Sequence, residues 1–522
     1  MRYIEGEDRN QKVLMPDVLD DYISDSNPVR VIDAYVDSLD LEKLGIGALS
    51  NETGRPPYSP RLMLKFYLYG YFNRIRSSRR LEKEAHRNIE LMWLLNKLAP
   101  DHKTIANFRK DNANALKNVF RDFVQLCRKL GLYGGELMAI DGSKFLAVNS
   151  LDNNYNQEKL DDRIKRIDAR LEKYLSEMNE ADKEESDTPV LSGEDIAAAI
   201  KALSERKQAY EDMKAELKET GENQLSTTDP DARRMKRGNG ASDICFNIQT
   251  AVDAKHKLII EYEVTNQCLD KNLLAPVAIS AKEALGVEEI TALADTGYFV
   301  ASDIAKCLVN GINPHVSTDL ESITICVPVH EDEANEPGDF DNQGKNIFIE
   351  ERNVGICPMG NILYPKSYRS SKDAGIYSNR KACKGCPHRN LCKEYDKELQ
   401  VKMLPSEFTK VHDINGLYIK QITYKPDKSL LKKRKEIVEH PFGTIKRSMD
   451  SEYCLMKGID NVRGEFALTF LAYNMKRAIN ILGVAKLIQV IRDNAFYYLF
   501  FWDGFQISCS ISISFRKLTR IA

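Results

Sequence analysis

The sequence predicts an α/β protein, a mixed β-sheet preceded by an all-α region and interrupted by two insertions. Apolar residues recur at helical spacing before residue 130, and short apolar runs after it have the length of strands. A stretch dense in charged residues separates the first of these strands from the later ones. At 522 residues the chain has room for two to four structural units.

Residues 1–130 are expected to form a helical N-terminal domain. Apolar side chains keep helical spacing around Leu64 and Leu94, and Asp101 stands where it would cap a further helix. Two interpretations fit this region: a DNA-binding module, or a helical bundle with a solvated basic face. In the first, the DNA contacts come from Arg76, Arg79, Arg80, Lys103, Asn107 and Arg109.

The α/β core is expected in residues 131–155 and 223–310. An apolar run leads directly into Asp141, and a predicted strand at 290–294 leads into Asp295. Two further strands and a helix are predicted between these acids. Each carboxylate would therefore stand at the end of a buried strand, although such an acid taken singly is equally compatible with a structural role.

Two insertions and a C-terminal part complete the predicted organisation. Residues 156–222 keep a helical apolar stripe and predict a charged helical hairpin, for which self-association is a candidate role. Residues 311–430 predict an irregular insertion, and residues 431–485 predict the last core helices, with Pro441 bending or restarting the first of them. The tail at 486–522 alternates apolar residues with serine near its end and has no assigned role.

Charge and cysteine content restrict the class of protein. Lys and Arg number 75 against 77 Asp and Glu, so basic surface for nucleic acid would have to be local. The charged start and the absence of an 18-residue apolar run predict a soluble, cytoplasmic protein. Four thiols within the second insertion, two at Cys-x2-Cys spacing, suit a structural Zn²⁺ site in a zinc-ribbon-like region; free thiols on a loop are the alternative. These are Cys357, Cys383, Cys386 and Cys392.

Asp141, Asp295 and Glu439 together suit a different metal chemistry. Mg²⁺ and Mn²⁺ prefer oxygen ligands, and a pair of such ions can activate a water or a 3′ hydroxyl at a phosphodiester and stabilise the leaving oxygen. This requires the three acids to converge in space, which their separation along the sequence leaves open. Asp270, which follows a predicted strand, is a candidate to support such a site without binding the metal itself.

Three blocks of sequence carry a family resemblance. Ile-Asp-Gly-Ser-Lys at 140–144, Ala-Asp-Thr-Gly-Tyr at 294–298 and Val-Glu-His-Pro-Phe-Gly-Thr-Ile-Lys at 438–446 resemble the signature blocks of DDE transposases of bacterial insertion sequences. The third block of that family resembles Tyr-x2-Arg-x3-Glu-x6-Lys. Glu439 and Lys446 keep its last spacing, whereas lysines replace the tyrosine and the arginine. With the blocks at 101–109 and 471–477, the resemblance covers roughly residues 15–485.

The resemblance implies a ribonuclease H-like core, and an enzyme that cuts and rejoins DNA with two Mg²⁺ or Mn²⁺ ions held by Asp141, Asp295 and Glu439. It implies that Lys446 contacts the phosphates beside the scissile bond. The expected partners are double-stranded DNA, namely the terminal inverted repeats of its element and target DNA, and a second copy of the chain in a DNA-bound homodimer at the nucleoid. Local positive charge would come from Lys144, Arg234, Arg237, Arg434 and Lys435.

Two alternatives share most of these features. One is a catalytically inactive protein that recognises the ends of an element without cutting them. The other is a metal-dependent nuclease that has no strand-transfer activity. For each basic residue named above, a solvated surface charge is the competing interpretation.

Overall fold

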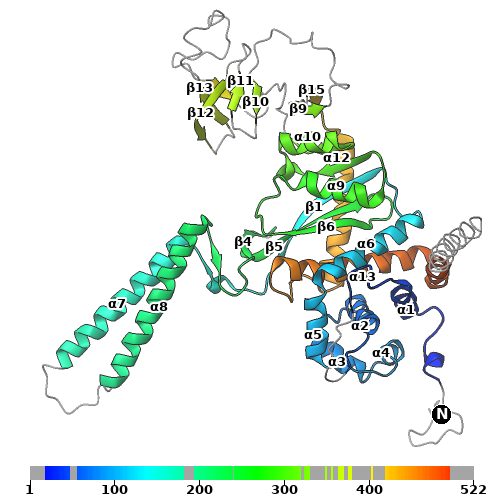
Figure 1. Cartoon of the computed structure of the whole chain (residues 1–522), viewed down its shortest axis with the longest axis horizontal. Helices are drawn as coiled ribbons and strands as arrows, with labels where there is room; N and C mark the ends of the chain where they lie inside the picture. The colour runs from blue at the N-terminus through cyan, green and yellow to red at the C-terminus, as the bar shows by residue number, and fades with distance from the viewer. Residues whose placement is uncertain are drawn as a thin grey trace, which may run out of the picture.

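The structure is a computed structural model of the chain (Figure 1). It describes residues 18–47, 56–181, 193–238, 240–318, 323–329, 347–349, 354–356, 362–369, 374–378, 401–403 and 418–493.

The N-terminal region is helical, as predicted. Asp101 caps the fifth helix, since its Oδ1 accepts hydrogen bonds from the backbone N–H groups of Lys103 and Thr104 at 2.9 and 3.1 Å. Pro60 occupies the first turn of the second helix, where its missing N–H costs nothing. The helices are α1 (Val29–Ser38), α2 (Pro60–Phe72), α3 (Ser78–Ala85), α4 (Ile89–Leu94), α5 (His102–Asp111) and α6 (Ala113–Lys129), after a short 3₁₀ turn at Leu19–Tyr22.

A mixed six-stranded sheet forms the centre of the molecule, which confirms the predicted α/β class. Its path runs β4-β5-β1-β7-β8, with β6 also paired to β5. β5 is antiparallel to β1, β4 and β6, whereas β1, β7 and β8 run parallel. The strands are β1 (Leu137–Leu146), β4 (Arg233–Lys236), β5 (Ser242–Asp253), β6 (Ile259–Thr265), β7 (Ile290–Ala294) and β8 (Ile312–Val316), with helices α9 (Leu274–Leu285) and α10 (Ala301–Val309) between them.

β8 corrects the predicted extent of the core. The second insertion was expected to begin at residue 311, yet Ile312–Val316 pairs in register with β7. The strand contains Pro314 and polar neighbours, which interrupt the apolar pattern that signals a strand. Proline is tolerated because β8 is the edge strand of the sheet.

Helix α13 (Ile459–Leu482) joins the N-terminal helices to the sheet. Gly464 allows the close approach, because a Cβ at this position would lie 2.6 Å from Ala113 Cα of α6. Asn474 of the same helix completes the edge of β6: its Oδ1 accepts from the Ile259 N–H at 2.9 Å, and its Nδ2 donates to the Ile259 carbonyl at 2.7 Å. These bonds give a structural reason for the asparagine in the 471–477 block.

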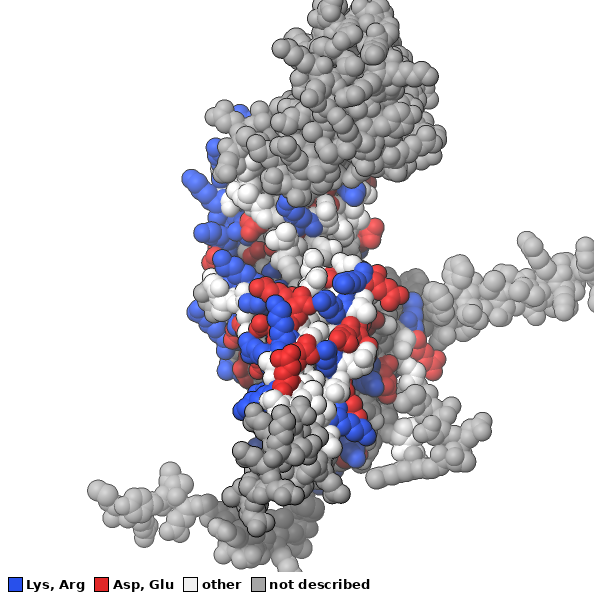
Figure 2. All heavy atoms as spheres, turned by 90° about the vertical axis from the view of Figure 1, so that its left-hand side faces the viewer, with Lys and Arg blue, Asp and Glu red and all other residues white. Residues whose placement is uncertain are grey.

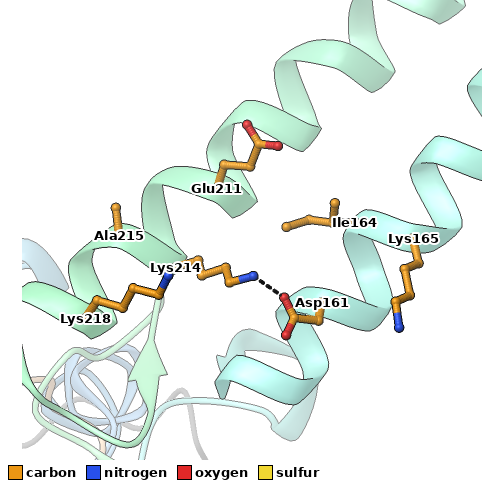
Figure 3. Close-up of a pocket in the computed structure, with 7 residues that line it drawn as sticks. All are labelled: Asp161, Ile164, Lys165, Glu211, Lys214, Ala215 and Lys218. Atoms are coloured by element: carbon orange, nitrogen blue, oxygen red, sulfur yellow. Dashed lines mark hydrogen bonds and ion pairs between the residues drawn. The ribbon is translucent and has the colours of Figure 1, made fainter.

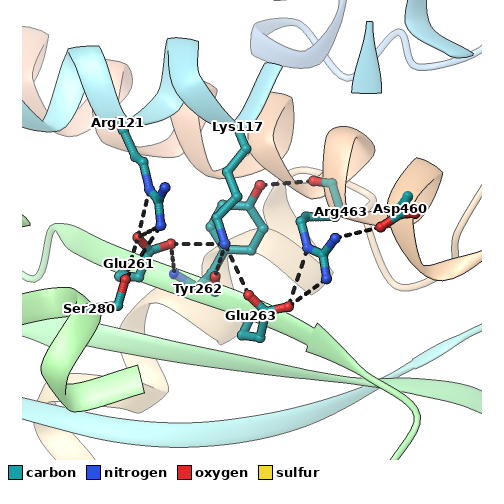
Figure 4. A network of polar contacts seen from close by, with 8 residues as sticks. All are labelled: Lys117, Arg121, Glu261, Tyr262, Glu263, Ser280, Asp460 and Arg463. Atoms are coloured by element: carbon teal, nitrogen blue, oxygen red, sulfur yellow. Dashed lines mark hydrogen bonds and ion pairs between the residues drawn. The ribbon is translucent and has the colours of Figure 1, made fainter. Parts of the chain in front are cut away.

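A polar network fixes three of these elements to one another (Figure 4). Lys117 and Arg121 of α6 bind the β6 carboxylates Glu263 and Glu261 at 3.0 and 2.9 Å. Arg463 of α13 binds Glu263 from the other side at 2.7 Å. Because Glu261 is buried, its charge requires these partners, so the network fixes how the helices sit on the sheet.

The first insertion is the predicted charged helical hairpin. Its helices, α7 (Gln157–Ala181) and α8 (Gly193–Thr220), project away from the sheet as one arm (Figure 1). A short antiparallel pair, β2 (Asn154–Tyr155) and β3 (Leu225–Ser226), closes its base. The arm has its own small apolar cluster, formed by Leu160, Ile167, Tyr210 and Leu217.

The second insertion is described only in part. β9 (Ile323–Val329) pairs with β15 (Tyr418–Tyr424), and a separate sheet follows the order β10-β11-β12-β13-β14. Its strands are Ile347–Ile349, Val354–Ile356, Ile362–Arg369, Ala374–Ser378 and Val401–Met403. The four cysteines of the expected zinc site, the acidic stretch at 331–341 and the tail from 494 onward lie outside the described residues.

The last core helices follow β15. Helix α12 (Lys428–Gly443) is capped by Asp427 and continues into a π-helical turn at Thr444–Ser448. Pro441, where the sequence predicts a bend or a restart, lies in the last turn of α12, three residues before the helix type changes. Among the helices that the structure describes, none has the length and apolarity needed to cross a bilayer.

Candidate functional site

Asp141 and Asp295 are brought together by the neighbouring inner strands β1 and β7. β1 and β7 are parallel neighbours, with Ala139 paired to Leu293, and each acid stands two residues beyond that pair. Asp141 Oδ1 accepts from the Gly142 N–H at 3.0 Å, and Asp295 Oδ1 accepts from the Gly297 N–H at 2.9 Å while capping a 3₁₀ turn. The structure therefore brings these two predicted residues together.

The electrostatics of Asp141 reflect this convergence. Burial raises the pKa of its carboxyl to about 6; the Arg434 charge works against this rise, and the Asp295 and Asp270 charges add to it. Two carboxylates close together and partly buried repel each other, and a cation bound between them would relieve this repulsion.

Arg434 supplies positive charge at this place. It lies on α12, which packs along β1 and β7, and its Nη1 is 3.6 Å from Asp141 Oδ1. Both side chains are mostly buried, with 15% and 24% of their surface exposed. The sequence predicted a DNA contact for Arg434, whereas in this structure its partner is the acid.

Glu439 is placed differently from the two aspartates. It is exposed on α12, and five residues of α-helix separate it from Arg434, which turns it about 140° away from the side that meets Asp141. Within the described residues, no three His, Cys, Asp or Glu side chains lie close enough to hold one metal ion. The structure thus assembles two of the three predicted acids.

Lys446 and Lys144 both lie beside the acids. Lys446 Nζ donates to the Lys144 carbonyl at 3.0 Å and stands 4.5 Å from the centre of the Phe145 ring. Burial, followed by the Arg237 charge, lowers the pKa of Lys446. Lys144 Nζ pairs with Asp270 Oδ1 at 3.2 Å. Lys446 is half-buried beside β1, whereas Glu439 is exposed on α12.

Sequence reasoning gave Asp270 only a minor role, yet it has more polar contacts at the site than Asp295. Its Oδ1 accepts from Lys144, from Asn247 Nδ2 at 2.7 Å and from Gln249 Nε2 at 2.8 Å. A signal was present in β5, where Asn247, Gln249 and Thr250 interrupt a buried apolar strand. Buried amides require polar partners, so that pattern points to a hydrogen-bonded acid nearby.

The donor set provides a test of whether a divalent cation fits. Asp141 and Asp295 offer the hard carboxylate oxygens that Mg²⁺ and Mn²⁺ prefer. Thr250 is paired directly opposite Asp141, so the two side chains share a face of the sheet, and the buried Thr250 Oγ1 has no hydrogen-bond partner. Two carboxylates and a hydroxyl without a hydrogen-bond partner are ligands of the type that such an ion prefers, whereas the third predicted carboxylate, that of Glu439, lies outside this group.

The predicted DNA-binding residues divide into exposed and paired groups. Arg237 pairs with Asp243 and Glu452. Figure 2 shows that basic and acidic side chains are interleaved over one face of the molecule, in keeping with the nearly balanced charge. Those exposed to solvent are Arg79, Arg80, Lys103, Asn107, Arg234 and Lys435.

Arg76 and Arg109 do not reach the surface, which corrects the expectation that they face DNA. Arg76 binds Glu465 of α13 at 3.4 Å and the Tyr453 carbonyl at 2.9 Å. Arg109 donates to the Tyr71 hydroxyl at 2.8 Å. Both guanidinium groups are buried where the N-terminal helices meet α13, so they hold that contact together.

The hairpin contains a separate hollow of about 500 Å³ between α7 and α8 (Figure 3). An ion pair between Lys214 and Asp161 crosses it. The hollow is open and lined by the charged faces of the two helices, on an arm that projects away from the part of the sheet holding Asp141 and Asp295 (Figure 1).

Comparison with known proteins points to one class. Residues 17–111 match the family model "Transposase domain (DUF772)", and residues 356–479 match "Transposase DDE domain". The first match covers helices α1 to α5, and the second contains Glu439, Lys446 and most of α13.

A solved structure of a piggyBac transposase synaptic complex with hairpin DNA is similar to this chain at 9% identity and a TM-score of 0.29. The match covers 90% of this chain and 79% of that one. At this TM-score the similarity carries no argument about fold or function. Among curated proteins, none matches the chain.

Both matched models describe transposase domains. More particularly, the two family matches confirm the resemblance to DDE transposases that the three sequence blocks predicted.

Proposed function

We propose that this protein is a transposase that cleaves DNA at the ends of an insertion sequence and joins those ends to target DNA. One observation carries the proposal: Asp141, within β1, and Asp295, directly after the parallel neighbour β7, come from two separate signature blocks and lie side by side. The match to a DDE transposase domain, which includes Glu439, supports the same conclusion. We further propose that the sheet is a ribonuclease H-like core, which is supported by the order in which the antiparallel strands β6, β5 and β1 are continued by the parallel strands β7 and β8.

Asp141 and Asp295 would hold divalent metal ions, with Glu439 completing the set. Bound by these acids, two such ions would activate the attacking oxygen and stabilise the leaving oxygen of a phosphodiester. For Glu439 to join them, α12 has to turn about its axis. The π-helical turn at Thr444–Ser448 is a suitable place to absorb that turn, since such turns interrupt regular helix bonding and recur at functional sites.

The basic residues around the acids would hold the DNA backbone. Lys446 and Lys144 flank β1, and Arg434 would be released to a phosphate once a metal ion takes over the charge of Asp141. The exposed Arg79, Arg80 and Lys103 would bind DNA further along.

The remaining expectations belong to the same proposal. Cutting two ends together calls for a DNA-bound homodimer, and the protein would act in the cytoplasm on chromosomal DNA. Cys357, Cys383, Cys386 and Cys392 would bind a structural Zn²⁺ ion.

A nicking and strand-transfer assay tests the function. Supercoiled plasmid carrying the ends of the element is incubated with Mg²⁺ and either the unchanged protein or Asp141→Asn. Nicks and joined products are expected only from the unchanged protein, and equal nicking by the variant would overturn the assignment. Joining is then checked separately with pre-cut ends, because a nuclease without strand transfer would nick the plasmid and yield no joined product.

The outward position of Glu439 favours a second candidate, a protein that binds element ends without cutting them. In that case the unchanged protein would retard the end DNA in a gel and leave the plasmid intact with either Mg²⁺ or Mn²⁺.

A further inference from the structure

Asp270 is tied to β1, the strand that carries Asp141, and to its neighbour β5. It lies in the loop between β6 and α9, and its Oδ1 accepts hydrogen bonds from Lys144, Asn247 and Gln249. Lys144 stands three residues after Asp141 on β1. Asn247 and Gln249 lie on β5 and are fully buried, so the carboxylate is held by amides that have little freedom to move.

The same network reaches the loop of Asp295. Gln249 Oε1 accepts a hydrogen bond from the hydroxyl of Tyr298, which is also buried. Tyr298 ends the 3₁₀ turn that Asp295 caps. A continuous chain of side chains, Tyr298 to Gln249 to Asp270 to Lys144, therefore joins the Asp295 turn to β1.

Gly142 leaves room for these hydrogen-bonded side chains. A Cβ at residue 142 would lie 2.2 Å from Gln249 Nε2 and 2.8 Å from Asp270 Oδ1. The glycine that follows Asp141 is thus required for Asp270 and Gln249 to close against β1. The Asp-Gly pair in the first signature block has a physical reason: the acid occupies one face of the strand, and the network passes over the other.

The second carboxylate oxygen of Asp270 lies near the turn that Asp295 caps. The position of a Cβ on Gly297 would lie 3.1 Å from Asp295 Oδ1 and 3.8 Å from Asp270 Oδ2, so the two oxygens flank one small space. In the described part of the chain, the side-chain hydrogen bonds to Asp270 all go to Oδ1.

We propose that Asp270 is a positioning residue of the metal site: it holds the Asp295 turn and Lys144 in place around Gly142, and so sets the spacing at which Asp141 and Asp295 bind a divalent ion. This inference rests on the proposed function. Partners that orient metal ligands typically change metal affinity by about 10- to 100-fold when removed.

Titration of the full-length protein with Mn²⁺ in a calorimeter tests this role without using catalysis. Asp270→Ala is expected to weaken Mn²⁺ binding by about tenfold or more. Asp270→Asn keeps an acceptor oxygen for the two buried amides and is expected to recover most of the affinity. Tyr298→Phe, which removes only the hydroxyl that bonds Gln249, is expected to weaken binding and carries the test if Asp270→Ala does not fold.

Asp303→Ala is the matched control. Asp303 Oδ2 accepts from the Leu274 and Ala275 N–H groups and so holds the start of α9, the helix that follows Asp270. Its loss is expected to lower the melting temperature and leave Mn²⁺ affinity unchanged, which separates damage to the fold from damage to the site.

The outcomes are distinguishable. Unchanged affinity in Asp270→Ala, or in Tyr298→Phe where the alanine variant does not fold, overturns the inference provided that Asp141→Asn abolishes binding. Complete loss in Asp270→Asn, equal to that in Asp141→Asn, would make Asp270 a metal ligand and also overturn the positioning role. If Asp141→Asn itself binds Mn²⁺ normally, the proposed metal site is wrong.

Discussion

Gly142→Ala is the substitution that most directly tests the packing at the site. Gly142 lies within strand β1, so the backbone accepts an alanine, and the effect must come from the added methyl group. That group would lie 2.2 Å from Gln249 Nε2, 2.8 Å from Asp270 Oδ1 and 3.0 Å from Asn247 Oδ1. All three neighbours are hydrogen-bonded to one another, and Asn247 and Gln249 are fully buried.

The expected cost follows from two effects. Overpacking a filled interior typically costs about 1 to 3 kcal/mol, and displacing a hydrogen bond to a charged carboxylate about 1.5 to 3 kcal/mol. Breaking the hydrogen bond lets the side chains move apart and relieves part of the overpacking, so the two costs do not add in full. We therefore expect a loss of about 2 to 4 kcal/mol in the free energy of unfolding. Urea unfolding followed by circular dichroism measures this loss, with the midpoint compared between variants.

Gly443→Ala is the control for this experiment. Gly443 ends α12, and no atom lies within 4 Å of the position that its Cβ would take. The same chemical change there is expected to leave stability unchanged or slightly increased, because alanine favours helix over glycine. A Gly142→Ala protein as stable as the Gly443→Ala protein would refute the close packing described for Asp270 and Gln249.

Three further predictions concern charge. The pKa of Asp141 is raised from 3.8 to about 6, so the folded state holds this proton more tightly than the unfolded chain does. The metal-free protein should therefore lose stability as the pH rises between these values. In thermal melts of Asp141→Asn, this dependence of stability on pH should disappear. The affinity of the unchanged protein for Mn²⁺ should fall as the pH drops through about 6. Glu465→Ala should lower the free energy of unfolding by about 3 to 5 kcal/mol, because it strands the buried guanidinium of Arg76; an effect within the error of urea unfolding would contradict the buried pair. Replacing exposed Arg79 and Arg80 by alanine should leave stability unchanged and reduce the salt dependence of DNA binding, measured by fluorescence anisotropy; an unchanged slope would exclude both from the DNA contact.

Much of the fold was predictable because its signals are local. The hairpin at 157–220 and the strand at 290–294 follow periodicities that are visible in short windows. β8 was not predicted, because Pro314 hides an edge strand, and neither was β4, because Arg233 and Arg234 were interpreted as a basic cluster.

The positions of Asp141 and Asp295 were predictable from their sequence motifs. The orientation of Glu439 and the burial of Arg76 were not. Asp141 and Asp295 each follow an apolar run, so the two acids come together once β1 and β7 pair in parallel, although β1 continues past Asp141 to Leu146. The direction in which Glu439 points depends on how α12 is turned on the sheet, which its own residues do not specify. Arg76 is buried because Glu465, far away in sequence, comes to meet it, and a basic side chain viewed in sequence alone resembles a surface charge.

The order in which the chain is synthesised gives α13 an additional significance. The N-terminal helices, β6 and α13 are held together by contacts of Ala113, Ile259 and Arg76 with Gly464, Asn474 and Glu465. A chain emerging from the ribosome has made Asp141 and Asp295 long before it has made α12 and α13. Domains fold as units while synthesis proceeds at about 5 to 20 residues per second. The growing chain therefore spends many seconds with both acids already made but without the helix that joins the two halves, so the complete fold forms only after α13 has been synthesised.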